Sequence, residues 1–119
     1  MRAVPGWRNF EVYVNELLGL EGTIASGSQF HDPGDGVDRR HHTETDFALM
    51  VDAKYSERAS FSVTAKFMGQ WVDKAQEQGK RFAMPIRLWP RGTLSPRDYL
   101  VISLDDFAEL LDKVRAGGR

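Results

Sequence analysis

The chain lacks cysteine altogether, and none of its apolar runs is long. Without cysteine it can form neither a disulfide framework nor a thiolate zinc site, and we expect a protein of the reducing cytoplasm. No apolar run approaches the roughly 18 residues that a membrane span needs. The first residues, MRAVPGWRNFE, lack the apolar core of a signal peptide. We therefore expect no membrane partner.

Net charge is also nearly absent, because 16 Lys and Arg stand against 17 Asp and Glu, giving a formal charge of -1. Nucleic-acid-binding domains are often distinctly basic, so the sum alone does not indicate one. Acids gathered in a metal site with bases around it would give the same sum and a strongly uneven field. With 41% apolar and 28% charged residues, the composition predicts one globular domain over residues 1–119.

Three stretches carry apolar residues at helical spacing and have recognisable ends. The first lies within residues 7–20 and stops at Gly19, and the second follows an N-cap at Thr64 and stops at Gly79. The third follows Ser103, which resembles a capping box with the acid three residues on. The stripe positions are Phe10, Val14, Leu17 and Leu18; Phe67, Met68, Trp71 and Ala75; and Phe107, Leu110, Leu111 and Val114. We expect the tail, residues 116–119, to be frayed.

Strands are predicted in residues 21–26, 47–55, 81–89 and 98–103, between and after the first two helices. Residues 27–45 are rich in Gly, Pro, Asp and His without periodicity, which predicts a loop or an open hairpin. Pro85 predicts that its strand is a sheet edge, or is bulged or bent there. The order of elements predicts an α/β domain in which helices flank a small central mixed β-sheet.

The strand over residues 47–55 carries an acid and a base one residue apart, and alternation puts Asp52 and Lys54 on one face. A surface ion pair would explain them and would contribute at best about 1 kcal/mol. Metal-dependent phosphodiester hydrolysis is the sharper hypothesis, because Mg²⁺ binds a few carboxylates together with water and phosphate oxygens. A lysine beside the metal can position the water. Glu11 on the first helix and an acid in the Gly-rich loop supply the further carboxylates.

Three motifs appear in an order typical of one nuclease family. GWRNFE resembles its opening helix with an acid at Glu11, SGSQFHDPGDGV resembles its loop to the motif aspartate, and DFALMVDAKYSE resembles its strand of acid, any residue, lysine. The chain resembles the restriction-endonuclease-like PD-(D/E)xK nucleases over nearly its whole length. Within them it is similar to archaeal-type and phage Holliday-junction resolvases. The resemblance implies Mg²⁺, with Mn²⁺ as a substitute, held by Glu11, Asp35, Asp52 and the Ala53 carbonyl, while Lys54 acts on the attacking water.

Four aspartates precede that strand, namely Asp32, Asp35, Asp38 and Asp46, and the loop ligand among them stays open. Asp46 faces the same way as Asp52, yet six residues of strand put about 20 Å between them. The sequence PGDGV best resembles the Gly-Asp-Val of the family, which favours Asp35, with Asp38 as the alternative.

The function implied by the resemblance is cleavage of branched DNA, above all four-way junctions, by paired nicks. Two other hypotheses are a related nuclease acting on other DNA and a DNA-binding module that has lost cleavage. The junction has approximate two-fold symmetry, so we expect a homodimer. Its interface could use Phe67, Trp71, Phe82 and Trp89, although each could equally be core. The residues expected to contact DNA are Arg8, Ser26, Ser28, Arg39, Arg40 and Arg58.

Three histidines, His31, His41 and His42, lie near several acids and raise the question of zinc. A structural zinc site needs four ligands held close together, which a loop with adjacent histidines seldom supplies. We expect these histidines to contact DNA or solvent.

Overall fold

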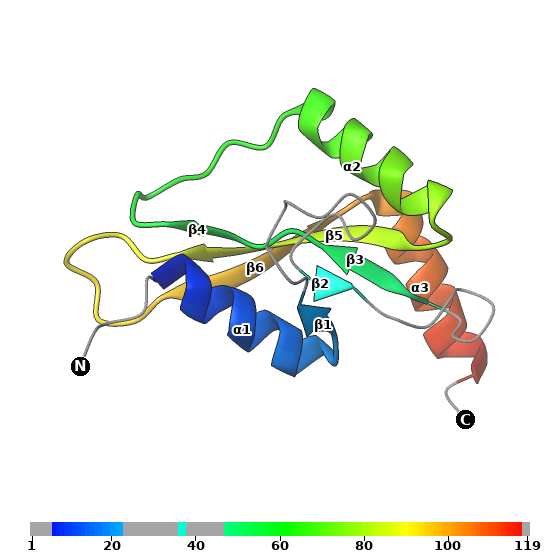
Figure 1. Ribbon diagram of the computed structural model, residues 1–119, viewed down its shortest axis with the longest axis horizontal. Coiled ribbons are helices and arrows are strands. Elements are labelled where there is room, and N and C mark those ends of the chain that lie inside the picture. The colour runs from blue at the N-terminus through cyan, green and yellow to red at the C-terminus, as the bar shows by residue number, and fades with distance from the viewer. Residues whose placement is uncertain (1–5, 23–35, 38–46, 118–119) are drawn as a thin grey trace.

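The computed structural model describes residues 6–22, 36–37 and 47–117 (Figure 1). Its elements in chain order are α1 (Gly6–Leu18), β1 (Glu21–Gly22), β2 (Gly36–Val37), β3 (Leu49–Val51), β4 (Lys54–Ser56), α2 (Ala65–Glu77), β5 (Arg81–Leu88), β6 (Arg97–Ile102) and α3 (Leu104–Gly117). The longest of these helices, α3, has 14 residues. Within the described ranges, no helix has the length and apolar character needed to cross a bilayer.

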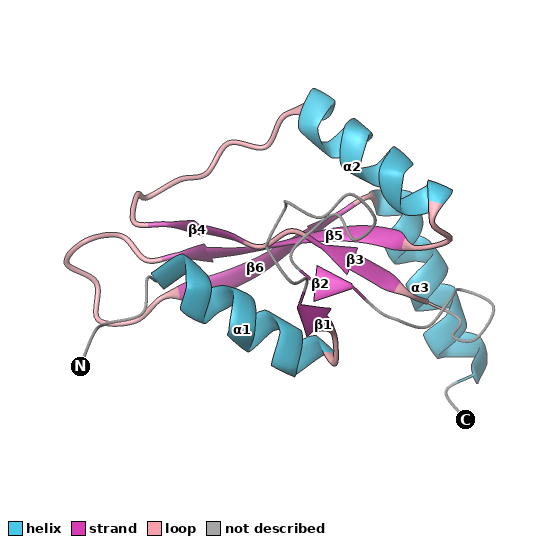
Figure 2. Ribbon diagram, viewed as in Figure 1, coloured by secondary structure: helices cyan, strands magenta, loops and turns pink. Residues whose placement is uncertain are grey.

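The strands form one mixed sheet with β5 at its centre (Figure 2). Both β3 and β4 run parallel to β5 along one of its edges, and β6 runs antiparallel along the other. Beyond β3 the sheet continues through β2 and then β1, and each pairs antiparallel with its neighbour. Of the loop or open hairpin expected over residues 27–45, the structure describes only residues 36–37, which form β2. The predicted mixed α/β class is confirmed.

Helices α2 and α1 cover opposite faces of the sheet (Figure 1). Successive strand residues point to opposite sides, so each face offers side chains to one of these helices. On one face Met50, Phe82 and Met84 pack with α2 through Phe67 and Trp71. On the other face Phe10 and Val14 of α1 pack with Val51 and Ala83. The two faces thus have separate hydrophobic clusters, one under α2 and one under α1.

Helix ends follow the predicted signals. The Thr64 hydroxyl accepts a hydrogen bond from the Phe67 amide at 3.1 Å, and the Ser103 hydroxyl accepts one from the Asp106 amide at 3.2 Å. Gly19 and Gly79 follow α1 and α2 with φ of +68° and +70°, the left-handed conformation that ends a helix. The expected fraying is wrong for residues 116 and 117, which continue α3; alanine favours helix, so the last turn can extend.

Two of the apolar stripes predicted on the helices are only partly buried. Leu17 is 65% exposed at the end of α1, and Phe107 and Val114 are 46% and 58% exposed on α3. Helical spacing selects a face, but burial needs a surface opposite that face.

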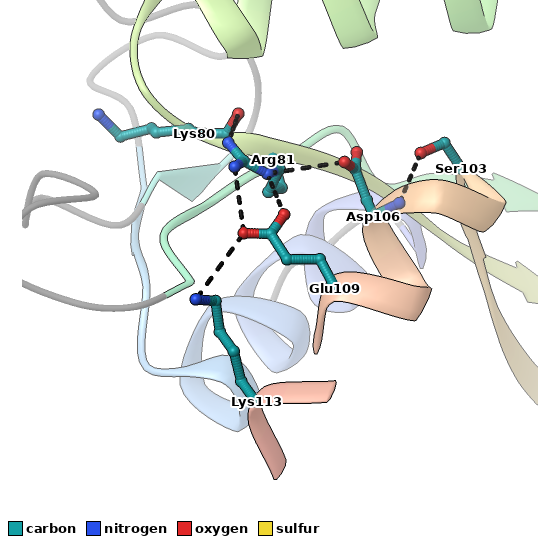
Figure 3. A network of polar contacts seen from close by, with 6 residues as sticks. All are labelled: Lys80, Arg81, Ser103, Asp106, Glu109 and Lys113. Carbon is teal, nitrogen blue, oxygen red and sulfur yellow. Dashed lines mark hydrogen bonds and ion pairs between the residues drawn. The ribbon is translucent and has the colours of Figure 1, made fainter. Parts of the chain in front are cut away.

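An arginine at the start of β5 holds α3 in place (Figure 3). The Arg81 guanidinium donates hydrogen bonds to both carboxylate oxygens of Glu109, at 2.7 and 3.2 Å. Its Nε also lies 3.6 Å from the Asp106 carboxylate, which is buried. The hydrogen bonds to Glu109 raise the pKa of Arg81, so its charge is held. This polar anchor compensates for the small apolar contact of α3.

The edge position expected for the Pro85 strand is wrong, because β5 has neighbours on both sides. The parallel ladder explains how a proline is accommodated. The Arg81 amide donates to Ala48 and the Asp52 amide donates to Ala83. In this alternating pattern the next donor, to the Asp52 carbonyl, would be residue 85, which has no N–H. The ladder is interrupted there, between β3 and β4.

Replacing the proline tests this account. In Pro85→Ala we expect the new amide to donate to the Asp52 carbonyl and to exchange slowly with solvent deuterium. The added hydrogen bond contributes about 1 kcal/mol, and the lost chain rigidity costs about as much, so unfolding in urea should change little. Exchange followed by NMR gives the measurement, and Pro90→Ala, in the turn after β5, is the matched control with fast exchange. Fast exchange at position 85 would contradict the ladder argument.

Candidate functional site

The acid and base expected on one strand face lie in direct contact. The Lys54 ammonium is 2.9 Å from one Asp52 carboxylate oxygen. The Asp52 side chain keeps only 12% of its surface in solvent, whereas the Lys54 side chain keeps 33%. A carboxylate that is nearly buried requires a partner, and Lys54 supplies it. The prediction that the two residues share a face is confirmed.

The lysine is held over the aromatic cluster of the α2 face. Its Nζ lies 5.3 Å from the centre of the Phe67 ring. Phe67 is itself fixed against Trp71 and the buried Phe82, with ring centres 6.2 and 6.5 Å away. Cation–π attraction and the ion pair therefore restrain the same ammonium group. Phe67, Trp71 and Phe82 pack in or against the core, leaving Trp89, 36% exposed, as the most accessible of the four expected interface residues.

Glu11 lies half-buried on α1, whose packing residues Phe10 and Val14 contact the other face of the sheet. Ala53, also half-buried, packs its side chain into that same cluster. Asp52 and Lys54 lie on the face that α2 covers, so the helix that carries Glu11 packs on the opposite face of the sheet from the acid–base pair. Within the described ranges, no group of three or more Asp, Glu, His or Cys side chains is close enough to hold a metal.

The remaining site candidates divide between the described and the other residues. Arg8 is exposed in the first turn of α1, and Arg58 is exposed after β4. Outside the described residues lie Asp35, Ser26, Ser28, Arg39 and Arg40, together with the alternatives Asp32, Asp38 and Asp46 and the histidines His31, His41 and His42.

A basic pocket beyond β4 includes an arginine that the sequence analysis did not select. Arg58 and Arg91 line this open pocket with Tyr55, Ser56 and Glu57. Arg91 is bound loosely, with its Nε 3.6 Å from an exposed Glu57 oxygen. Burial, with the Glu57 carboxylate adding to it, raises the pKa of the Tyr55 hydroxyl above its usual 10.0. No local motif marks Arg91, which reaches the pocket only because the turn after β5 folds beside β4.

Arg87 positions the helix that carries Glu11. Its guanidinium donates two hydrogen bonds of 2.8 Å to Asp98 on β6, which raise the pKa of Arg87. The same group lies over the Phe10 and Tyr13 rings of α1, 4.8 and 5.2 Å from their centres. One residue of β5 thus joins α1 to two strands. From the sequence alone, a polar residue at this strand position would be expected to face solvent. The role of Arg87 in holding α1 is visible only with the helix in place.

Gly6 sets the approach of the same helix to β4. A Cβ atom at this position would lie 2.5 Å from the Tyr55 ring, closer than real Cβ contacts allow. The absence of a side chain therefore lets the start of α1 rest on the residue after Lys54.

We compared the chain with protein-family models, with curated proteins and with solved structures. None of the three comparisons found a significant match.

Proposed function

We propose that the protein is a metal-dependent, structure-selective DNA endonuclease, with four-way junctions as its principal substrate and paired nicks by a homodimer as its product. The observation that carries the proposal is the contact between Asp52 and Lys54 at 2.9 Å, where the sequence from the end of β3 to the start of β4 reads Asp-Ala-Lys. Together with the acid of α1, it fits the order of acids and lysine in the PD-(D/E)xK nucleases that the sequence resembles.

The donor set fits a hard divalent cation. Glu11, Asp35, Asp52 and the Ala53 carbonyl would hold Mg²⁺ or Mn²⁺ through oxygen atoms, which both metals accept. When bound, the metal would neutralise phosphate charge and lower the pKa of an attacking water.

Lys54 is the residue to orient the water. Its ammonium is restrained by Asp52 and Phe67 but keeps a third of its side-chain surface open to solvent. The water oxygen forms a bond to phosphorus as the ester P–O bond breaks, and charge builds on the phosphate oxygens. A fixed cation beside these oxygens stabilises that charge. Arg58 and Arg91 line the pocket beyond the end of β4, and they are suited to contact the phosphates next to the one that is cleaved.

The register of β2 supports Asp35 over Asp38 as the loop ligand. Gly36 pairs with Val51, and Val37 pairs with Met50. Asp35 precedes Gly36 in the chain, just as Asp52 follows Val51, so the Gly36 end of β2 is the end nearer Asp52. Asp38 follows Val37 at the opposite end.

A branched DNA substrate would be met in the cytoplasm of a prokaryotic cell, including during phage infection.

Cleavage assays test the proposal directly. Labelled linear, forked and four-way DNA are incubated with Mg²⁺ or with EDTA, and we expect cutting only with the metal and fastest on the four-way form. Asp52→Asn and Lys54→Ala should each lower the rate at least about 100-fold, because one removes a metal ligand and the other the group that orients the water.

Lys66→Ala, an exposed lysine in the first turn of α2, is the control and should cut normally. Circular dichroism must show that all the variants fold. Wild-type cutting by Lys54→Ala would refute the assignment of this lysine. Preference for linear or forked DNA would indicate a nuclease of another substrate, and metal-independent binding without cutting would indicate a binding module.

The loop ligand has a separate test. We expect Asp35→Asn to be inactive and Asp38→Asn to be at most impaired, since only the first removes a carboxylate next to the Gly36 end of β2. Cleavage rates at saturating Mg²⁺ and the Mg²⁺ concentration for half-maximal rate are the measurements. If the two phenotypes are reversed, Asp38 is the ligand.

A further inference from the structure

Strand β6 is an apolar sheet edge. Among the described strands it pairs only with β5. Its last four residues are Tyr99, Leu100, Val101 and Ile102, and the first two of these are each 52% exposed. Proteins usually protect an edge with charge, proline or a bulge, because an open edge binds another strand. This stretch contains no charged residue and no proline.

The ladder shows which backbone groups lie at the open edge. The Arg81 amide donates to the Ala48 carbonyl, directly before β3, and the Ala83 carbonyl accepts from the Asp52 amide, so the odd-numbered residues of β5 direct their backbone amides and carbonyls toward β3 and β4. Its even-numbered residues therefore face β6, where Met84 pairs with Val101 and Ile86 pairs with Tyr99. It follows that Asp98, Leu100 and Ile102 direct their amides and carbonyls away from the sheet.

We infer that this edge binds β6 of a second copy of the chain, antiparallel and with Leu100 opposite Leu100 about a two-fold axis. An antiparallel strand pair is self-complementary, so identical strands can close an interface with two-fold symmetry. Centring on Leu100 lets all three outward-facing residues bond, because Asp98 then lies opposite Ile102 of the second copy. In this register no charge lies opposite a like charge.

Exposed side chains beside the strand supply the remaining area. A stable dimer covers about 800 Å² on each partner, more than one strand edge offers. On the α1 face Leu100 borders a groove of about 240 Å³ lined mainly by Tyr13, Leu17, Leu18 and Pro85. Leu100 of the second copy would lie against the open end of this groove and add apolar contact to it.

The two ends of β6 match each other. Leu94, in the turn before β6, is 98% exposed, and Leu104, directly after β6, is 81% exposed. Antiparallel pairing brings the first end of one copy beside the second end of the other, and it does so twice. Two leucines that are isolated in one chain thereby gain apolar neighbours in the pair.

The pairing of two copies would also bring two candidate sites to one side of the joined sheet, and this part of the inference rests on the proposed function. Residues directly opposite each other share a face of a sheet, so the joined sheet would present both Asp52–Lys54 pairs on one side. Five strand spacings separate β4 of one copy from β4 of the other, or about 24 Å. A two-fold DNA junction could then meet both sites in one encounter.

Light scattering coupled to size-exclusion chromatography tests the inference by measuring the mass of the protein. The measurement uses neither DNA nor metal, so its outcome does not depend on nuclease activity. At micromolar concentration we expect twice the chain mass of 13.5 kDa. Leu100→Lys and Leu100→Glu should each halve the measured mass, because like charges then lie opposite. Mixing the two variants should restore the double mass, since only the mixed pair places opposite charges together.

Val63→Lys, an exposed apolar position before α2, is the control and should keep the double mass. A monomeric wild-type protein would overturn the inference, as would a dimer that persists in both Leu100 variants, since that dimer must use another surface. Dimerisation in a protein that cuts no DNA would leave the interface standing and refute the proposed function alone.

Discussion

One pairing register along β5 determines the geometry of the candidate site. Val51 pairs with Ala83 and Lys54 pairs with Ile86, so β3 and β4 keep the same offset across the residues between them. Because the offset is kept, strand alternation survives the interruption, and Asp52 and Lys54 stay on the face that α2 covers. A slip of one residue would turn both side chains to the other face. The ion pair thus depends on a backbone match that is kept across the two residues between β3 and β4.

Pro85 in β5 removes one backbone hydrogen bond from this pairing, directly beside Asp52. A missing amide in a central strand would ordinarily be a defect, but here it faces the carbonyl of Asp52, where the neighbouring strand is interrupted. On the same strand Arg87 bonds Asp98 and covers two rings of α1. One strand therefore fixes the acid, leaves the backbone beside it open, and positions the helix that carries Glu11.

Local signals in the sequence predicted those features that depend on a few neighbouring residues. The caps at Thr64 and Ser103 and the shared face of Asp52 and Lys54 belong to this kind. The position of Pro85 could not be predicted, because the effect of a proline depends on which edge its missing amide would face, and only the assembled sheet decides this. The exposure of Phe107 could not be predicted for a similar reason, since helical periodicity does not say whether a partner surface exists.

The distribution of charge shows why composition says little about DNA binding in this chain. Arg81 and Arg87 are engaged in bidentate pairs with Glu109 and Asp98, so these two cations stabilise the fold and are poorly placed to meet phosphate. Arg58 and Arg91 line an open pocket, and the contact of Arg91 with Glu57 is exposed and screened by salt. Formal net charge counts both kinds equally, whereas only accessible cations can release counterions from DNA. A chain of charge -1 can therefore present a basic surface wherever its acids are used inside the structure.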